Sequence, residues 1–163
     1  MLKRTVSTKE IDEKEAMIRA EALCSSRECC ISEIEEKLIR WGQKPEAQQR
    51  IICHLLKERY IDEKRFCRAF ALDKMRYNRW GRIKIGQALR LLGVSERDRE
   101  AALDELPTEE YEEIFVRLLR AKSPTIKAAS DYEHRAKLIR FLQGRGFELR
   151  LIMNHIENLP QSR

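Results

Sequence analysis

The sequence predicts an all-α protein built from three tandem three-helix repeats. Gly and Pro together number only ten among 163 residues, no segment alternates polar and apolar residues as a half-buried strand does, and one apolar frame occurs three times. A single three-helix unit of about 50 residues has a marginal core, so we expect neighbouring repeats to pack end to end. The result would be an elongated, curved helical array, either right-handed or left-handed.

The repeated frame is centred on three glycines, Gly42, Gly93 and Gly146. Apolar residues stand eight and four positions before each glycine, and others stand ten and thirteen positions after it. Apolar positions four apart that end at a glycine predict a helix closed by a left-handed residue. The later apolar pair predicts a second helix, and an amphipathic stretch before each frame predicts one more, so each repeat has three helices.

The first repeat covers residues 1–58, and its predicted helices span about 8–24, 31–41 and 45–58. Ser7 with Glu10, and Ser32 with Glu35, have the spacing of a capping box, which satisfies free amide groups at a helix start. Pro45 suits the first position of the third helix, because the amide N–H that proline lacks would have no partner there.

The second repeat covers residues 59–106, and its predicted helices span about 62–78, 81–92 and 95–106. Asp62 is the predicted N-cap of the first of these helices, because its carboxylate can accept from the first free amides. Ser95 with Asp98 has capping-box spacing and predicts the start of the third helix.

The third repeat covers residues 107–163, and its predicted helices span about 108–122, 131–144 and 147–158. Thr108 after Pro107 indicates the first start, and Ser130 with Glu133 indicates the second. The acidic residues from Glu109 to Glu113 open the first helix, where carboxylates favour the positive end of the helix dipole, so we interpret them as helix stabilising.

Positive charge is concentrated in the second repeat. The chain holds 33 Lys and Arg against 27 Asp and Glu, a net charge of +6, yet nine basic residues and one acidic residue lie between Lys64 and Arg90. A run this one-sided favours a binding surface for phosphates or an acidic protein over a solvated helix face. The predicted contact residues are eight of these cations and the two aromatic residues among them: Arg65, Arg68, Lys74, Arg76, Tyr77, Arg79, Trp80, Arg82, Lys84 and Arg90.

No motif indicates catalysis, a metal site or a cofactor. Adjacent Cys29 and Cys30 point to different sides of a helix and no CxxC pair occurs, so we interpret the five cysteines as reduced, buried thiols. The segment GRIKIG, residues 81–86, lacks the ending of a phosphate-binding loop. We therefore expect neither an enzyme nor a metal or cofactor site.

No membrane segment is predicted. No apolar stretch approaches the roughly 20 residues that a membrane helix needs, and the opening MLKRTVSTKEIDEKE has no apolar signal core. We expect a cytoplasmic protein.

Motifs in all three repeats together match one family signature. YIDEKRFCRAF at residues 60–70, WGRIKI at residues 80–85 and Leu89-x3-Gly93-Val94 lie in the second repeat. SEIEEKL at residues 32–38 precedes Gly42 in the first repeat, and KLIRFL at residues 137–142 precedes Arg145-Gly146-Phe147 and Ile152 in the third. In these motifs, from about residue 16 to residue 156, the chain resembles the RecX family of recombinase regulators.

The resemblance implies three tandem helical repeats, in agreement with the frame. It further implies a regulator that binds the RecA recombinase filament on DNA, within its groove, and lowers filament growth, ATP hydrolysis and strand exchange in DNA repair, recombination and the SOS response. We expect a monomer whose contacts with DNA are unspecific. The chain departs from the family in having Arg59 where Gly is common, Glu63 where a second Asp is common, and Cys67 where Ala is common.

Two other functions stay open on the sequence alone. Three-helix units commonly bind DNA, so the chain is alternatively a helix-turn-helix-like protein that recognises duplex DNA directly, as a dimer on a palindromic site. A purely structural repeat scaffold is the third interpretation, and it predicts no effect on recombination and no DNA binding.

Overall fold

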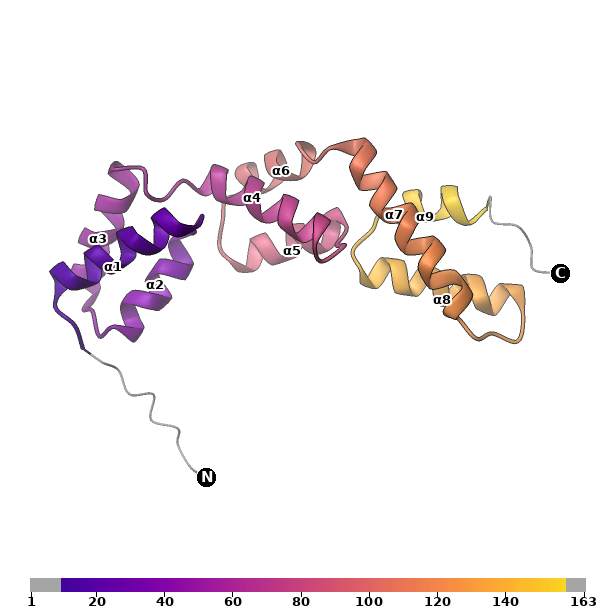
Figure 1. Cartoon of the computed structure of the whole chain (residues 1–163), viewed down its shortest axis with the longest axis horizontal. Coiled ribbons are helices and arrows are strands. Elements are labelled where there is room, and N and C mark those ends of the chain that lie inside the picture. The colour runs from indigo at the N-terminus through magenta and orange to yellow at the C-terminus, as the bar shows by residue number, and fades with distance from the viewer. Residues whose placement is uncertain (1–9, 158–163) are drawn as a thin grey trace, which may run out of the picture. The chain divides into compact units, whose positions relative to one another are not determined.

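A computed structural model describes residues 10–157 of the chain (Figure 1). Within that range every regular element is helical, so the predicted all-α class is confirmed. The nine α-helices and one short 3-10 helix are α1 (Glu13–Ser26), α2 (Ile31–Arg40), α3 (Pro45–Lys57), α4 (Glu63–Arg76), α5 (Arg82–Leu91), α6 (Glu96–Asp104), α7 (Thr108–Lys122), η1 (Ser123–Thr125), α8 (Asp131–Gly144) and α9 (Leu149–Ile156).

The glycine frame has the geometry that its spacing predicts. Gly42, Gly93 and Gly146 have φ angles of 73°, 76° and 88°, in the left-handed region. The six apolar positions before the glycines are fully buried: Ile34, Leu38, Ile85, Leu89, Leu138 and Leu142. The later frame positions are less uniform. Leu55, Leu106 and Ile156 are buried, Ile52 and Leu103 are half-buried, and Leu159 lies outside the described residues.

The predicted start of the first helix and the predicted cap of the second are wrong, although α2 begins at Ile31 as its predicted bounds have it. The N-cap of α1 is Asp12, whose carboxylate accepts from the Glu15 amide at 2.7 Å, and the predicted cap Ser7 lies outside the described residues. The N-cap of α2 is Cys30, not Ser32, because Glu33 provides the returning carboxylate. Because a thiol is a poor cap, the sequence predicts the cap at the polar Ser32, two residues later.

The other start signals are confirmed. Asp62 Oδ1 accepts from the Arg65 amide at 2.9 Å at the start of α4. Ser95 and Ser130 accept from the amides of the third residues after them. Pro45 is the first residue of α3.

The described chain forms two compact units. The first contains residues 10–66 and 92–94, and the second contains residues 67–91 and 95–157. In the first unit the buried core is formed by side chains from α1, α2 and α3 and the segments beside them: Ala16, Ala20, Cys24, Cys29, Ile34, Leu38, Ile51, Leu55 and Ile61.

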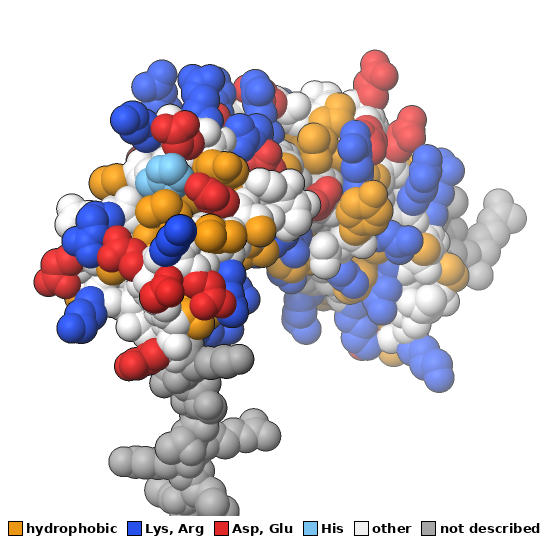
Figure 2. Space-filling model, turned by 60° about the vertical axis from the view of Figure 1, so that its left-hand side comes forward, with side chains coloured by type: hydrophobic (Ala, Val, Ile, Leu, Met, Phe, Trp, Pro, Cys, Tyr) orange, Lys and Arg blue, Asp and Glu red, His pale blue; other side chains and the backbone are white. Residues whose placement is uncertain are grey.

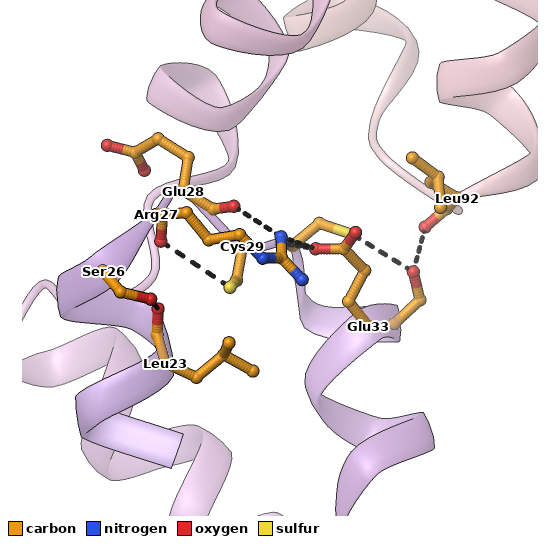
Figure 3. A network of polar contacts seen from close by, with 9 residues as sticks. Leu23, Ser26, Arg27, Glu28, Cys29, Glu33 and Leu92 are labelled. Atoms are coloured by element: carbon orange, nitrogen blue, oxygen red, sulfur yellow. Dashed lines mark hydrogen bonds and ion pairs between the residues drawn. The ribbon is translucent and has the colours of Figure 1, made fainter. Parts of the chain in front are cut away.

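A polar network surrounds the start of α2 in the first unit (Figure 3). The Arg27 guanidinium donates to the Glu28 carbonyl at 2.9 Å and to Glu33 Oε2 at 3.0 Å. Ser32 Oγ donates to the Leu92 carbonyl at 2.7 Å. The serine hydroxyl, which does not cap the helix, thus holds the short segment 92–94 against the rest of this unit.

In the second unit the loop between α4 and α5 packs on the turn between α8 and α9. The amides of Gly81 and Ile83 donate to the carbonyls of Arg145 and Gly146 at 2.8 and 3.0 Å. A Cβ atom on Gly81 would lie 2.2 Å from the Gly146 carbonyl oxygen, so only glycine fits this approach. Phe115 packs edge-on against Phe147 beneath it, with ring centroids 5.1 Å apart.

Four of the five cysteines are buried as predicted, and Cys53 is exposed. Burial, together with the neighbouring Cys29, raises the pKa of Cys24 to about 12, so this thiol stays protonated. Residues 10–157 contain no helix that is both long and apolar enough to cross a membrane.

Candidate functional site

The ten predicted contact residues differ in how far their charge is paired within the chain. Arg65 belongs to the first compact unit, whereas the other nine belong to the second. The structure separates them into three groups, according to whether each side chain pairs with a carboxylate, lies beside an aromatic ring or extends into solvent.

Two arginines of α4 form paired contacts with carboxylates elsewhere in the second unit, one just after α6 and one in α7. Arg68 donates from Nε to Glu105 Oε2 and from Nη2 to Glu105 Oε1, and the second of these hydrogen bonds is 2.7 Å long. Arg76 donates to both oxygens of Glu110 at 2.8 and 2.9 Å. The hydrogen bond from Arg76 lowers the pKa of Glu110 below its ordinary value. Much of the charge on these two arginines is therefore matched within the molecule.

Arg82 is a half-buried cation of the predicted set. Its guanidinium lies 3.9 Å from the centroid of the Tyr111 ring and donates to Glu148 Oε1 at 3.2 Å. The Tyr111 hydroxyl in turn donates to Glu148 Oε2 at 2.6 Å and accepts from the Arg82 amide at 3.0 Å. Burial, followed by the hydrogen bond to Glu148, raises the pKa of Tyr111. Arg82 thus ties α5 to α7 and α9.

Arg65 also has a carboxylate partner. Its Nε atom pairs with Glu28, and its Nη2 atom donates to the Arg59 carbonyl at 3.3 Å. These contacts hold the start of α4 against the segment between α1 and α2 in the first unit. Figure 2 shows the same mixing of Lys and Arg with Asp and Glu over the N-terminal helices, in keeping with the balanced charge of residues 1–58.

Trp80 is enclosed by two lysines of its own chain. The Lys74 ammonium lies 5.2 Å from the indole centroid and the Lys84 ammonium lies 4.7 Å from it. Contacts of this kind contribute roughly 0.5–1 kcal/mol at exposed sites. The half-buried ring therefore positions two cations beside the loop, while its own faces are partly occupied.

Tyr77 and Arg79 are the most open part of the loop. The Tyr77 side chain is 81% exposed, and Arg79 is exposed with a left-handed φ of 54°. Within the described residues neither side chain has an ion-pair partner. We call Lys74, Tyr77, Arg79, Trp80 and Lys84 the loop surface. Arg90 is exposed near the far end of α5, apart from it.

Sequence analysis missed the acidic partners. Glu28, Glu105, Glu110 and Glu148 lie 34 to 66 residues away from the arginines that they bind. The only local signal was the acidic start of α7, which we interpreted as stabilising the helix dipole. Glu110 in that segment instead accepts both hydrogen bonds from Arg76, and Glu148 lies at the start of α9.

The described residues hold no group of three or more His, Cys, Asp or Glu side chains that could coordinate a metal ion. The loop surface consists of cations and aromatic rings. Side chains of these types can contact phosphate or carboxylate groups and can pack against aromatic or apolar groups.

Comparison with known families shows the family to which the chain belongs. A model of the second three-helix domain of RecX matches residues 62–103, and a model of the third matches residues 109–155. Together the two matches cover more than half of the chain. The chain belongs to the RecX family. The loop surface lies inside the segment that matches the second RecX domain.

Two curated relatives carry the name Regulatory protein RecX. The one from Lactobacillus johnsonii is 29% identical over 121 residues, which are 74% of this chain and 45% of the relative. The one from Chlorobium limicola is 28% identical over 148 residues, which are 91% of both chains. The chain thus spans less than half of the first relative and most of the second. Its family supports a regulatory role.

Solved RecX structures have the same fold. A crystal structure of regulatory protein RecX superimposes with a TM-score of 0.80 at 20% identity and covers 90% of this chain and 73% of its own. RecX from Lactobacillus salivarius gives a TM-score of 0.77 at 19% identity, covering 90% and 97%. At this identity the likeness establishes the tandem helical architecture and nothing finer.

Proposed function

We propose that this RecX-family chain binds the RecA recombinase filament on DNA and restrains its growth, ATP hydrolysis and strand exchange. It acts by binding alone, as a monomer in the cytoplasm, without catalysing a reaction. The three repeats, residues 1–58, 59–106 and 107–163, would contact neighbouring RecA subunits and oppose their relative movement during ATP turnover. Contacts with DNA inside the filament would be unspecific.

The loop surface is the part of the predicted set that best supports this proposal. An exposed tyrosine beside uncompensated cations is a common composition for the centre of a protein interface, where Tyr, Trp and Arg contribute most of the binding energy. Hydrogen bonds from Gly81 and Ile83 fix the base of the loop, so little conformational entropy is lost on binding. Arg65, Arg68, Arg76 and Arg82 contribute to the fold first, since each is held by a carboxylate of this chain.

The test compares wild type with a Tyr77→Ala/Arg79→Glu variant. Both residues are exposed, so the change should leave the fold intact. Arg97→Glu, an exposed charge reversal on α6, is the matched control. Co-sedimentation with RecA filaments, the RecA ATPase and strand exchange are measured for each protein. We expect the double variant to bind roughly tenfold more weakly, with the control near wild type.

Two results would contradict this proposal at different levels. Equal inhibition by wild type and the double variant would mean that the loop surface is not the contact. If wild type neither sediments with RecA filaments nor inhibits them, the proposed function itself is wrong. A gel shift with random and genomic duplex DNA tests the alternative function, because sequence-specific binding would favour a protein that recognises DNA directly.

A further inference from the structure

A second basic region lies in the third repeat, where the charge of the whole repeat conceals it. Residues 107–116 contain four acidic residues and no basic ones, whereas residues 117–145 contain eight basic and two acidic residues. The repeat is therefore polarised along its sequence. Its positive part covers the end of α7, the connection through η1 and most of α8, drawn in orange in Figure 1.

The positive part contains an open surface depression with a volume of about 380 Å³, between the end of α7, the η1 connection and the middle of α8. Its lining combines four cations with three less polar side chains: Lys122, Lys127, Lys137, Arg140, Thr125, Ile126 and Phe141. We call it the lysine pocket. Its volume is in the range of small-ligand sites and exceeds what one inorganic phosphate fills.

Most of the positive charge in the lysine pocket is uncompensated. Lys137 pairs with Glu133 at 2.6 Å and also donates to the Lys127 carbonyl. Lys122 lies over the Phe141 ring at 4.8 Å, a contact that leaves its charge unneutralised. Within the part of the chain that the structure describes, Lys122, Lys127 and Arg140 have no carboxylate partner. Three like charges around one concavity attract a polyanion.

We infer that the lysine pocket binds the phosphate backbone of a single nucleic-acid strand. Lysine is depleted from protein–protein interfaces but binds phosphate well as a point charge, so three lysines among four cations favour nucleic acid over an acidic protein. Thr125, Ile126 and Phe141 give the lysine pocket an apolar side against which a sugar or base packs. The site is separate from the loop surface, and this inference does not depend on the recombinase.

The test measures the anisotropy of a fluorescent dT20 oligonucleotide with the full chain and no recombinase, from 50 to 300 mM salt. Lys127→Gln/Arg140→Gln removes two exposed cations of the lysine pocket. Arg117→Gln/Arg120→Gln removes the same charge from exposed positions of α7 that do not line it, and is the matched control. Circular dichroism confirms that both variants fold.

We expect the pocket variant to lose two phosphate contacts. Each single-strand contact contributes about 0.7 to the slope of log K against log salt, so the slope should fall by about 1.4 and affinity at 0.1 M salt by roughly 25-fold. The control should keep the wild-type slope. Equal losses in both variants, or no loss in the pocket variant, would overturn the inference. A poly-glutamate peptide that competes as well as dT20 would also overturn it, because the lysine pocket would then show no preference for phosphate over carboxylate.

Discussion

A methyl group at Gly81 should destabilise the second compact unit strongly. In Gly81→Ala the added Cβ would lie 2.2 Å from the Gly146 carbonyl oxygen and 2.4 Å from the Phe147 amide nitrogen. Both are backbone atoms of the α8–α9 turn, so the loop and the turn must separate. Overpacking of this kind costs about 1–3 kcal/mol, and each of the two hydrogen bonds across the contact contributes about 1 kcal/mol. We expect a loss of about 3 kcal/mol.

Urea unfolding followed by circular dichroism measures this loss. For a chain of this size, 3 kcal/mol corresponds to a fall in Tm of about 6–12 °C. Gly144→Ala is the control, because apart from its chain neighbours and the backbone of its own helix no atom lies within 4 Å of the position that its Cβ would take. The control should be neutral or slightly stabilising, since alanine favours helix over glycine. A loss below about 1 kcal/mol in Gly81→Ala, or one no larger than in Gly144→Ala, would refute the close-approach argument.

Three further predictions follow from single residues. Arg59 has a left-handed φ of 58°, so Arg59→Gly should raise the free energy of unfolding by roughly 0.5–1 kcal/mol, and a decrease in urea unfolding would contradict the strain. Because Arg76 lowers the pKa of Glu110, the stability from this pair is present above the ordinary carboxyl pKa of 4.5 and is lost as the pH falls through the lowered folded value. In Arg76→Gln an NMR titration should find the Glu110 pKa shifted upward. An unchanged pKa would count against the pair. Ellman's reagent should react rapidly with one thiol of the native chain at pH 8, and Cys53→Ser should remove that reaction; a second fast thiol would show that a buried cysteine is accessible.

The sequence was informative wherever structure depends on neighbours within a few turns. The spacing of Leu38, Leu89 and Leu142 before their glycines predicts helix ends, because a left-handed closing residue is a local requirement. The bounds of α2 are predicted correctly, but its cap was assigned to Ser32 because Cys30 is a weak cap; the carboxylate that completes the capping box is Glu33, not Glu35. Weak cap signals of this kind locate the capping residue only to within one or two positions.

The candidate site was less predictable because its charges are paired over long distances. Counting the charge from Lys64 to Arg90 treats every cation as available to a binding partner. Four arginines of that run bind carboxylates at least 34 residues away, and no local pattern marks them. Gly81 lies in the segment GRIKIG, which lacks the ending of a phosphate-binding loop, but this glycine has a second meaning. An isolated glycine next to a helix start also indicates a close backbone approach, and that is its role here.

Most cations that hold the fold are arginines, and most of those available to a partner are lysines; Arg79, Arg140 and the paired Lys137 are exceptions. The guanidinium group has a planar fork that matches both oxygens of a carboxylate, so Arg68 and Arg76 find partners within the chain. The lysine ammonium lacks that fork, and Lys74, Lys84 and Lys122 lie over aromatic rings with their charge unneutralised. The net charge of +6 therefore does not show how many cations are open to a partner, because four arginines between Lys64 and Arg90 are paired within the chain. Salt should accordingly weaken binding to polyanions at the lysine pocket more than it weakens the folded state, because arginine pairs held at short range are screened less than open lysines.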